Sequence, residues 1–246
     1  YLARPEEMGD YIDAVVATCD HVAARRGSAK RLMLSFDEWN VWQRGPDRPK
    51  PEPWAFAPHL AEGAYTVEDA LVVGGMLITL LNHCDRVRVA CIAQVVNVLG
   101  PIMTAAGGPA WRNTIFFPFA DASRLGRGLV LQPVTDVPTY DTADRPAVPY
   151  LAASYVLDPE TGGLAVLAVN RHTDEPLELA LELRAFDELK PGEWRVLRHD
   201  DVDACNTADS PDAVAPGTGG EIAVDGARLT AVLAPASWNA IRLLPA

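Results

Sequence analysis

The sequence predicts an α/β region followed by an antiparallel β-sandwich, with the change near residue 128. Before that residue, segments with helical spacing alternate with short apolar runs, an order typical of half an α/β barrel or a doubly wound sheet. After it, short segments with strand alternation are separated by turns rich in Pro, Gly and Asp. We therefore expect an α/β domain over residues 1–128 and a sandwich domain over residues 129–246, with no flexible linker.

The first predicted helix covers residues 5–27. It opens with Pro and Glu and closes on Arg-Arg-Gly, which are helix start and stop signals. The short apolar run over residues 31–36 follows as a strand. The apolar residues of the helix recur at helical spacing and predict an amphipathic helix: Met8, Ile12, Val15, Val16, Cys19 and Val22.

Residues 66–84 predict a second helix, which begins at Thr66 with acidic residues in its first turn and is apolar nearly all round. Such a helix must be covered on several sides. Gly74 and Gly75 each weaken it by roughly 1 kcal/mol relative to Ala. We therefore expect close packing of this helix against a strand.

The mostly apolar, β-branched run over residues 86–98 predicts a strand buried on both faces of a parallel sheet. Residues 109–126 predict a further helix, interrupted at Pro118 and ended by Gly126. The sandwich is predicted from eight later runs with strand alternation, which cover residues 128–135, 148–158, 163–171, 177–184, 194–200, 221–226, 228–235 and 237–244. The acidic stretch 199–212 is interpreted as a solvated loop.

Composition and charge restrict the partners. The formal net charge of −12 disfavours nucleic acid and anionic membrane surfaces, which are bound through excess Lys and Arg. The sequence contains no run of eighteen apolar residues of the kind that indicates a membrane span. The four cysteines lie far apart without a C-x-x-C pair, which argues against zinc and against a disulfide framework. We expect reduced cysteines, a cytoplasmic protein, and neither a metal nor a cofactor.

The stretch "RLMLSFDEWNVW", residues 31–42, carries the strongest chemical signal. An apolar run ends in Asp37 and Glu38, beside two tryptophans, and ligands of parallel α/β sheets bind where the strands end. Strand alternation predicts that the two carboxylates point to opposite sides. A carboxylate beside aromatic rings suits sugar chemistry. The alternative is a structural acid that pairs with an arginine such as Arg44.

Several blocks in order resemble the carboxyl-terminal half of glycoside hydrolase family 51, the α-L-arabinofuranosidases. The blocks are "LSFDEWNVW", "YTVEDALVVGGMLITLLNHCDRVRVACIAQVVNVLGPI", "GGPAWRNTIFFPFADASRLGRG", "YDTADRPAVPYL", "AVNRH" and "LTAVLAPASWNAIRL". The resemblance implies a retaining hydrolase. It also implies strands seven and eight of a (β/α)₈ TIM barrel followed by a jelly-roll-like antiparallel β-sandwich.

By this resemblance, Glu38 is the catalytic nucleophile at the end of barrel strand seven. Trp42 lines the arabinose pocket, and Gln94 on the strand-eight segment hydrogen-bonds the sugar or the nucleophile. Read from the residues alone, Trp42 is more simply a packing residue, and Gln94 a group that satisfies buried backbone. Trp54 and Phe56 either form a lid or belong to a stiff connector.

The family's second carboxyl group belongs to an Asn-Glu pair on strand four, and no Asn-Glu dipeptide occurs in this sequence. We therefore expect a fragment whose partners are the N-terminal part of the same protein and an arabinose-containing oligosaccharide. The family also implies a homo-oligomer, commonly a hexamer. Two alternatives stay open: a non-catalytic carbohydrate-binding protein, and a relative that cleaves a β-1,4-glucan or xylan backbone.

Overall fold

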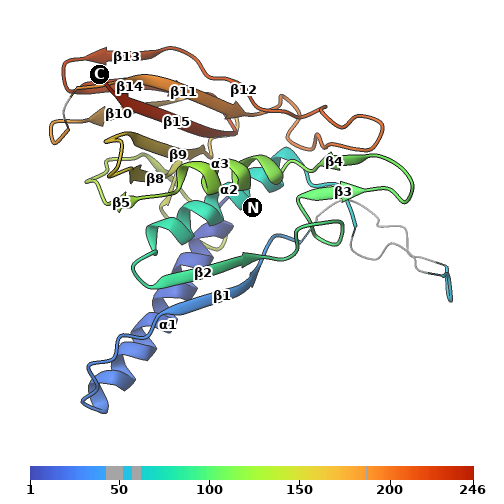
Figure 1. Cartoon of the computed structure of the whole chain (residues 1–246), viewed down its shortest axis with the longest axis horizontal. Helices are drawn as coiled ribbons and strands as arrows, with labels where there is room; N and C mark the ends of the chain where they lie inside the picture. Colours follow the sequence, from blue (N-terminus) through green and yellow to red (C-terminus); the bar gives the residue numbers. More distant parts are fainter. Residues whose placement is uncertain (43–51, 57–61, 187) are drawn as a thin grey trace.

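A computed structural model describes residues 1–42, 52–56, 62–186 and 188–246. Helices α2 and α3 lie between a six-stranded sheet on one side and the short parallel pair β1–β2 on the other (Figure 1). A three-stranded sheet covers the far face of the six-stranded sheet. An α/β part followed by a sandwich is therefore confirmed.

The first two helices form where the sequence predicts them. Helix α1 spans Arg4–Arg25 and helix α2 spans Val67–Asn82. Thr66 caps α2, because its side chain accepts a hydrogen bond from the Asp69 amide while the Asp69 carboxylate accepts one from the Thr66 amide. This reciprocal capping box satisfies two backbone donors that would otherwise be unpaired at the helix start.

Strand β1 spans Leu34–Trp39 and pairs in parallel with β2, which spans Val87–Ile92. The prediction that the second strand is buried on both faces is wrong. Val89 is 49% exposed and Cys91 is also exposed. Core side chains cover one face of this pair, and no other strand of the described ranges pairs with it.

The third predicted helix is shorter than expected. Helix α3 spans Phe116–Leu125 and ends at Gly126, as predicted, but Ala110–Arg112 forms strand β4, which pairs with β3, Ile102–Thr104. Pro118 does not interrupt α3, because it lies in the first turn. Backbone N–H groups there have no acceptor within the helix, so a missing donor is tolerated.

All eight runs predicted as sandwich strands contain strands, and every strand pair in the two larger sheets is antiparallel. The six-stranded sheet has the order β12-β11-β15-β9-β8-β5, and the three-stranded sheet has the order β10-β14-β13. A further short pair, β6–β7, lies outside these sheets. The bounds are β5 Leu129–Leu131, β6 Thr139–Tyr140, β7 Val148–Pro149, β8 Leu151–Leu157, β9 Leu164–Asn170, β10 Leu177–Glu182, β11 Leu189–Leu197, β12 Gly217–Thr218, β13 Ile222–Asp225, β14 Arg228–Leu233 and β15 Ser237–Pro245.

One hydrophobic core lies between the two sheets, and another joins α1, α2 and α3 to the opposite face of the six-stranded sheet. A Cβ atom added at Gly74 would lie 2.6 Å from the Trp238 ring of β15, and one at Gly75 would lie 2.6 Å from Pro5 of α1. The close packing expected at Gly74 is confirmed. The division at residue 128 stays a prediction.

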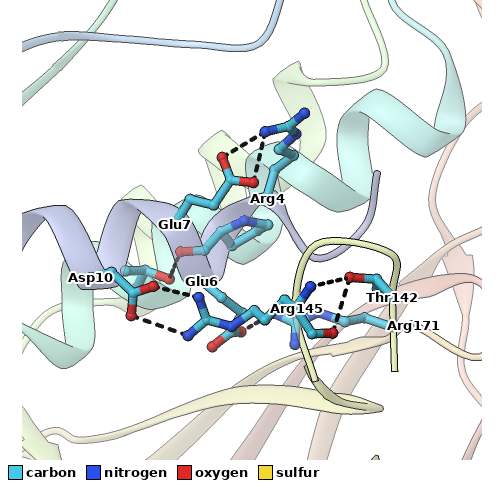
Figure 2. Close-up of polar contacts among 9 residues, drawn as sticks. Arg4, Glu6, Glu7, Asp10, Thr142, Arg145 and Arg171 are labelled. Atoms are coloured by element: carbon cyan, nitrogen blue, oxygen red, sulfur yellow. Dashed lines mark hydrogen bonds and ion pairs between the residues drawn. The ribbon is translucent and has the colours of Figure 1, made fainter. Parts of the chain in front are cut away.

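Two ion pairs attach α1 to the sandwich (Figure 2). Glu6 accepts a hydrogen bond of 2.6 Å from Arg171, whose side chain is buried, and Asp10 pairs with both terminal nitrogens of Arg145. The Arg145 hydrogen bond lowers the pKa of Asp10. Within the ranges that the structure describes, no helix combines the length and apolar character needed to cross a membrane.

Candidate active site

The parallel pairing of β1 and β2 brings their carboxyl ends to one edge. Trp39 is paired with Ile92, and the Ala93 amide donates a hydrogen bond of 3.0 Å to the Trp39 carbonyl. Glu38 precedes Trp39 and Gln94 follows Ala93. A single backbone hydrogen bond, between Ala93 and Trp39, therefore links the chain neighbours of the two predicted site residues.

A β-bulge occurs at the two carboxylates. The pairs Phe36–Ala90 and Trp39–Ile92 enclose Asp37 and Glu38 on β1 but only Cys91 on β2. Such an extra residue breaks the alternation of side chains. The predicted placement of the two carboxylates on opposite sides assumed regular alternation and stays a prediction. Asp37 and Glu38 are both exposed, and the Ser35 hydroxyl donates a hydrogen bond to Asp37.

The two tryptophans have different environments. Trp39 is 5% exposed and stacks on Phe119 of α3 with ring centroids 6.5 Å apart. Trp42 is 70% exposed, although it follows Trp39 by only three residues. Trp39 is thus a core residue that fixes the strand against α3. The role that the family resemblance predicted for Trp42, lining the arabinose pocket, stays a prediction, and its ring is exposed at this edge.

Gln94 is placed differently from the sequence interpretation. Strand β2 ends at Ile92, so Gln94 lies beyond the strand and is exposed. The interpretation that it satisfies buried backbone from within an apolar strand is therefore wrong. Its position past the end of a parallel strand is the one in which α/β sheets present side chains to ligands.

Asn40 and Tyr65 hold this edge together, and the sequence interpretation missed both. The Asn40 side-chain amide donates to the carbonyls of Ala93 and Leu99 at 2.8 and 2.7 Å, and its oxygen accepts from the Val41 amide. The buried Tyr65 hydroxyl donates to the carbonyls of Val41 and Leu99. The only available signal was an amide two residues after Glu38.

Glu38 has no cationic neighbour within 4 Å among the described residues. Arg44, the alternative structural partner, lies outside the described residues. Two cavities of about 560 and 600 Å³, one between α1, α2 and the sandwich and one beside β10, do not include Glu38. Glu38 therefore lies on an open face. Trp54 and Phe56 are fully exposed, which leaves the lid a prediction.

Comparisons with known proteins identify the relatives of the chain. Residues 37–237 match the family described as "Alpha-L-arabinofuranosidase C-terminal domain". The intracellular exo-alpha-(1->5)-L-arabinofuranosidase of Halalkalibacterium halodurans is 47% identical over 99% of this chain and 48% of its own length. The corresponding enzyme 1 of Bacillus subtilis is 45% identical with the same coverage. The chain spans about half the length of these curated relatives.

Solved structures agree with this relationship. A family 51 alpha-L-arabinofuranosidase from Bifidobacterium longum is 39% identical, with a TM-score of 0.88 over 98% of this chain and 48% of that one. A GH51 arabinofuranosidase from Xanthomonas axonopodis, 24% identical with a TM-score of 0.83 over 98% of this chain and 46% of that one, shares the fold. The chain therefore belongs to the alpha-L-arabinofuranosidase C-terminal domain family, which confirms the resemblance to family 51 that the sequence motifs indicated.

Proposed function

We propose that the complete protein is a retaining α-L-arabinofuranosidase. It removes terminal arabinofuranosyl units from oligosaccharides derived from arabinan or arabinoxylan. The observation that carries the proposal is the shared edge of β1 and β2, where Glu38 and Gln94 are linked through the hydrogen bond between Ala93 and Trp39. The names of these curated relatives support the reaction and, for those proteins, a (1→5) linkage.

Glu38 acts as the nucleophile in this proposal. A carboxylate oxygen bonds to the anomeric carbon as the bond from that carbon to the leaving oxygen breaks. A second carboxyl group gives its proton to the leaving oxygen and then takes a proton from the water that releases arabinose.

Gln94 and Trp42 bind the sugar. An exposed amide past the end of β2 can donate to and accept from the sugar hydroxyls. The exposed Trp42 ring offers an apolar face to the C–H groups of a furanose.

The remaining half of the protein supplies what this chain lacks. We propose that it carries the acid/base carboxyl group and the other barrel strands, which cover the open face of β1 and β2. Residues 1–128 then complete the barrel and residues 129–246 form the sandwich. We also propose a cytoplasmic location, since the relatives are named intracellular. A homo-oligomer stays a prediction from the family.

The test compares two isosteric substitutions in the complete protein, Glu38→Gln and Asp37→Asn. Both remove one carboxylate from the same exposed stretch of β1, so they are matched for the change in charge and for exposure. We expect Glu38→Gln to lower kcat on an aryl α-L-arabinofuranoside by several orders of magnitude, roughly 10⁴-fold or more. Asp37→Asn retains most of the activity, since only Glu38 forms the bond.

Equal losses in the two variants would remove the special role of Glu38. Hydrolysis of aryl xylosides or cellobiosides, with no activity on arabinofuranosides, would instead support a relative that acts on a polysaccharide backbone. Binding of arabino-oligosaccharides without turnover by the wild-type protein would support the non-catalytic alternative. Retention is checked separately by the anomeric configuration of the first product in an NMR time course.

A further inference from the structure

The stretch over residues 199–212, predicted to be a solvated loop, contains a buried residue that contacts strand β4 of the β3–β4 hairpin. The connection from Arg198 to Pro216, between β11 and β12, lies beside β4 (Figure 1). We call it the sandwich loop. Its residue Asn206 is 0% exposed, and Val214 is also buried. The prediction of a solvated loop is therefore wrong for this part.

Asn206 makes three hydrogen bonds with its side chain. Its amide nitrogen donates to the carbonyl of Arg112 at 3.0 Å and to the carbonyl of Val214 at 2.8 Å, and its oxygen accepts from the Val214 amide at 2.7 Å. Two of these bonds close the loop on itself. The third reaches β4, a strand of the region assigned to the barrel.

A short path of backbone contacts leads from Arg112 to Gln94. Arg112 pairs with Ile102 across β3 and β4. The Ile102 amide donates to the Val95 carbonyl at 3.2 Å, and the Ile102 carbonyl accepts from the Asn97 amide at 2.8 Å. Val95 directly follows Gln94. The β3–β4 hairpin thus lies between the sandwich loop and the backbone that carries Gln94.

Other contacts attach the sandwich loop to the same side of the molecule. The carbonyls of Ala204 and Val202 accept hydrogen bonds of 3.0 Å from the Val67 and Glu68 amides in the first turn of α2. The exposed side chains of Arg112 and Asp212 form an ion pair of 2.8 Å. These contacts hold the loop against two elements that flank the edge, so its position relative to Gln94 is well defined.

We propose that Asn206 is a positioning residue for sugar binding, acting through the β3–β4 hairpin on Gln94. This inference rests on the proposed function for its effect on catalysis. The sandwich then determines the geometry of the barrel edge, in addition to covering the helices. Asn206 touches neither the substrate nor Glu38, so its loss displaces a binding group and leaves β1, the strand that carries the nucleophile, in place.

The experiment uses the complete protein with Asn206→Ala and the matched control Thr207→Ala. Thr207 is the next residue and is exposed, and its side chain accepts a hydrogen bond from the Ser210 amide within the loop. We expect Asn206→Ala to raise KM for an aryl α-L-arabinofuranoside by about ten-fold or more, since small displacements of binding groups have large effects. Thr207→Ala leaves KM unchanged.

A double-mutant cycle with Gln94→Ala distinguishes positioning from general support of the fold. If Asn206 acts through Gln94, the double variant has the same KM as Gln94→Ala alone, because the displaced group has already been removed. If the two losses multiply, the proposal is wrong. A KM for Asn206→Ala equal to that of Thr207→Ala would overturn it equally.

Hydrogen exchange provides a readout that does not depend on activity. Asn206→Ala should speed exchange in peptides covering residues 93–104 without changing those from α1, whereas Thr207→Ala should change neither. Unchanged exchange over residues 93–104 would contradict the proposal. If the wild type hydrolyses no arabinofuranoside, the proposed function fails, and the exchange comparison still decides whether the loop holds this segment.

A milder variant covers the possibility that Asn206→Ala does not fold. Asp212→Asn removes only the exposed ion pair with Arg112, so its fold should be unaffected. We expect the same changes in KM and in exchange over residues 93–104, each smaller than for Asn206→Ala. If Asn206→Ala does not fold and Asp212→Asn changes neither quantity, the proposal is wrong.

Discussion

Helix α2 and strand β2 are similarly apolar in sequence but have opposite environments. Nearly every side of α2 is covered, by α1, by α3 and by β8, β9 and β15 of the sandwich. Strand β2 has cover on one face only, and Val89 and Cys91 are exposed on it. An apolar segment therefore indicates that its side chains have to be buried. The residues that bury them can lie far away in the chain or outside it.

The difference also separates stability from function. The closed side, around α2, contains the tight contacts that hold the chain together. The open side, around β1 and β2, contains the exposed carboxylates and Gln94. Because the chain spans about half the length of its curated relatives, we attribute the open side to contacts with the other half and with substrate. The predictions below compare the two sides.

The largest expected difference is between the two tryptophans of the same motif. Trp39→Ala should lower the free energy of unfolding by about 3–5 kcal/mol, because it removes a buried ring stacked on Phe119. Trp42→Ala should change it by less than about 0.5 kcal/mol and raise KM instead. Urea unfolding and steady-state kinetics of the complete protein measure both. Equal stability losses would contradict the assignment of Trp42 to the open side.

A smaller loss is expected from filling the contact between α2 and β15. Gly74→Ala places a Cβ atom 2.6 Å from the Trp238 ring, and we expect it to lower the free energy of unfolding by about 1–3 kcal/mol. Gly217→Ala is the matched control, since a Cβ there meets nothing within 4 Å. Urea unfolding distinguishes the two. A stabilising Gly74→Ala would mean that Trp238 can move aside.

The same Val→Thr substitution on the closed and on the open side tests whether the exposed face of the β1–β2 pair is covered in the complete protein. Val73→Thr puts a hydroxyl into the closed core and should reduce stability by about 1–2 kcal/mol. In the complete protein we expect a similar loss for Val89→Thr, because the missing half should bury the exposed face of β2. Differential scanning calorimetry of both variants measures this. A neutral Val89→Thr would show that the face stays open to solvent.

The smallest expected effect concerns Asp121, a buried carboxylate on the closed side. Its pKa is raised by burial, against the opposing effects of the Trp238 indole N–H and the guanidinium groups of Arg195 and Arg124. A folded-state pKa above the unfolded value stabilises the protein at low pH, and this stability is lost as pH rises through the folded pKa. In the Asp121→Asn variant, the free energy of unfolding should therefore not show this decrease with rising pH.

The pH dependence of unfolding checks that expectation. The stability of Asp121→Asn relative to wild type should increase as pH rises from acid toward neutral, since the variant has no charge to desolvate and can still accept from Trp238. Urea midpoints at several pH values provide the comparison. A relative stability that falls with rising pH would show that the arginines outweigh burial.

Most of the fold could be predicted from sequence because its signals are local. Turns rich in Pro, Gly and Asp separate the sandwich strands, some of which, such as β10, alternate between apolar and polar residues. Thr66 with the acidic first turn marks the start of α2. The β3–β4 hairpin was missed because each strand has only three residues. Its turn does contain Gly107, whose φ of 66° favours glycine, so a turn signal was present.

The site was predictable only in part. Glu38, Trp42 and Gln94 were named from a family motif, and parallel pairing explains why the first and last of these meet at one edge. The bulge at Asp37 and Glu38 was not predictable, because it depends on how β1 and β2 pair. The role of Asn206 was also hidden, since a hydrogen bond to a backbone carbonyl 94 residues away leaves no local pattern.

The most direct test of the account is to trap the covalent intermediate. The complete protein is incubated with a fluorinated arabinofuranosyl substrate that forms the glycosyl-enzyme rapidly and releases it slowly, then digested and analysed by mass spectrometry. We predict a single arabinosyl adduct, attached to the Glu38 carboxylate. An adduct on Asp37 or on any other residue, or turnover with no adduct and inversion at the anomeric carbon, would contradict the account.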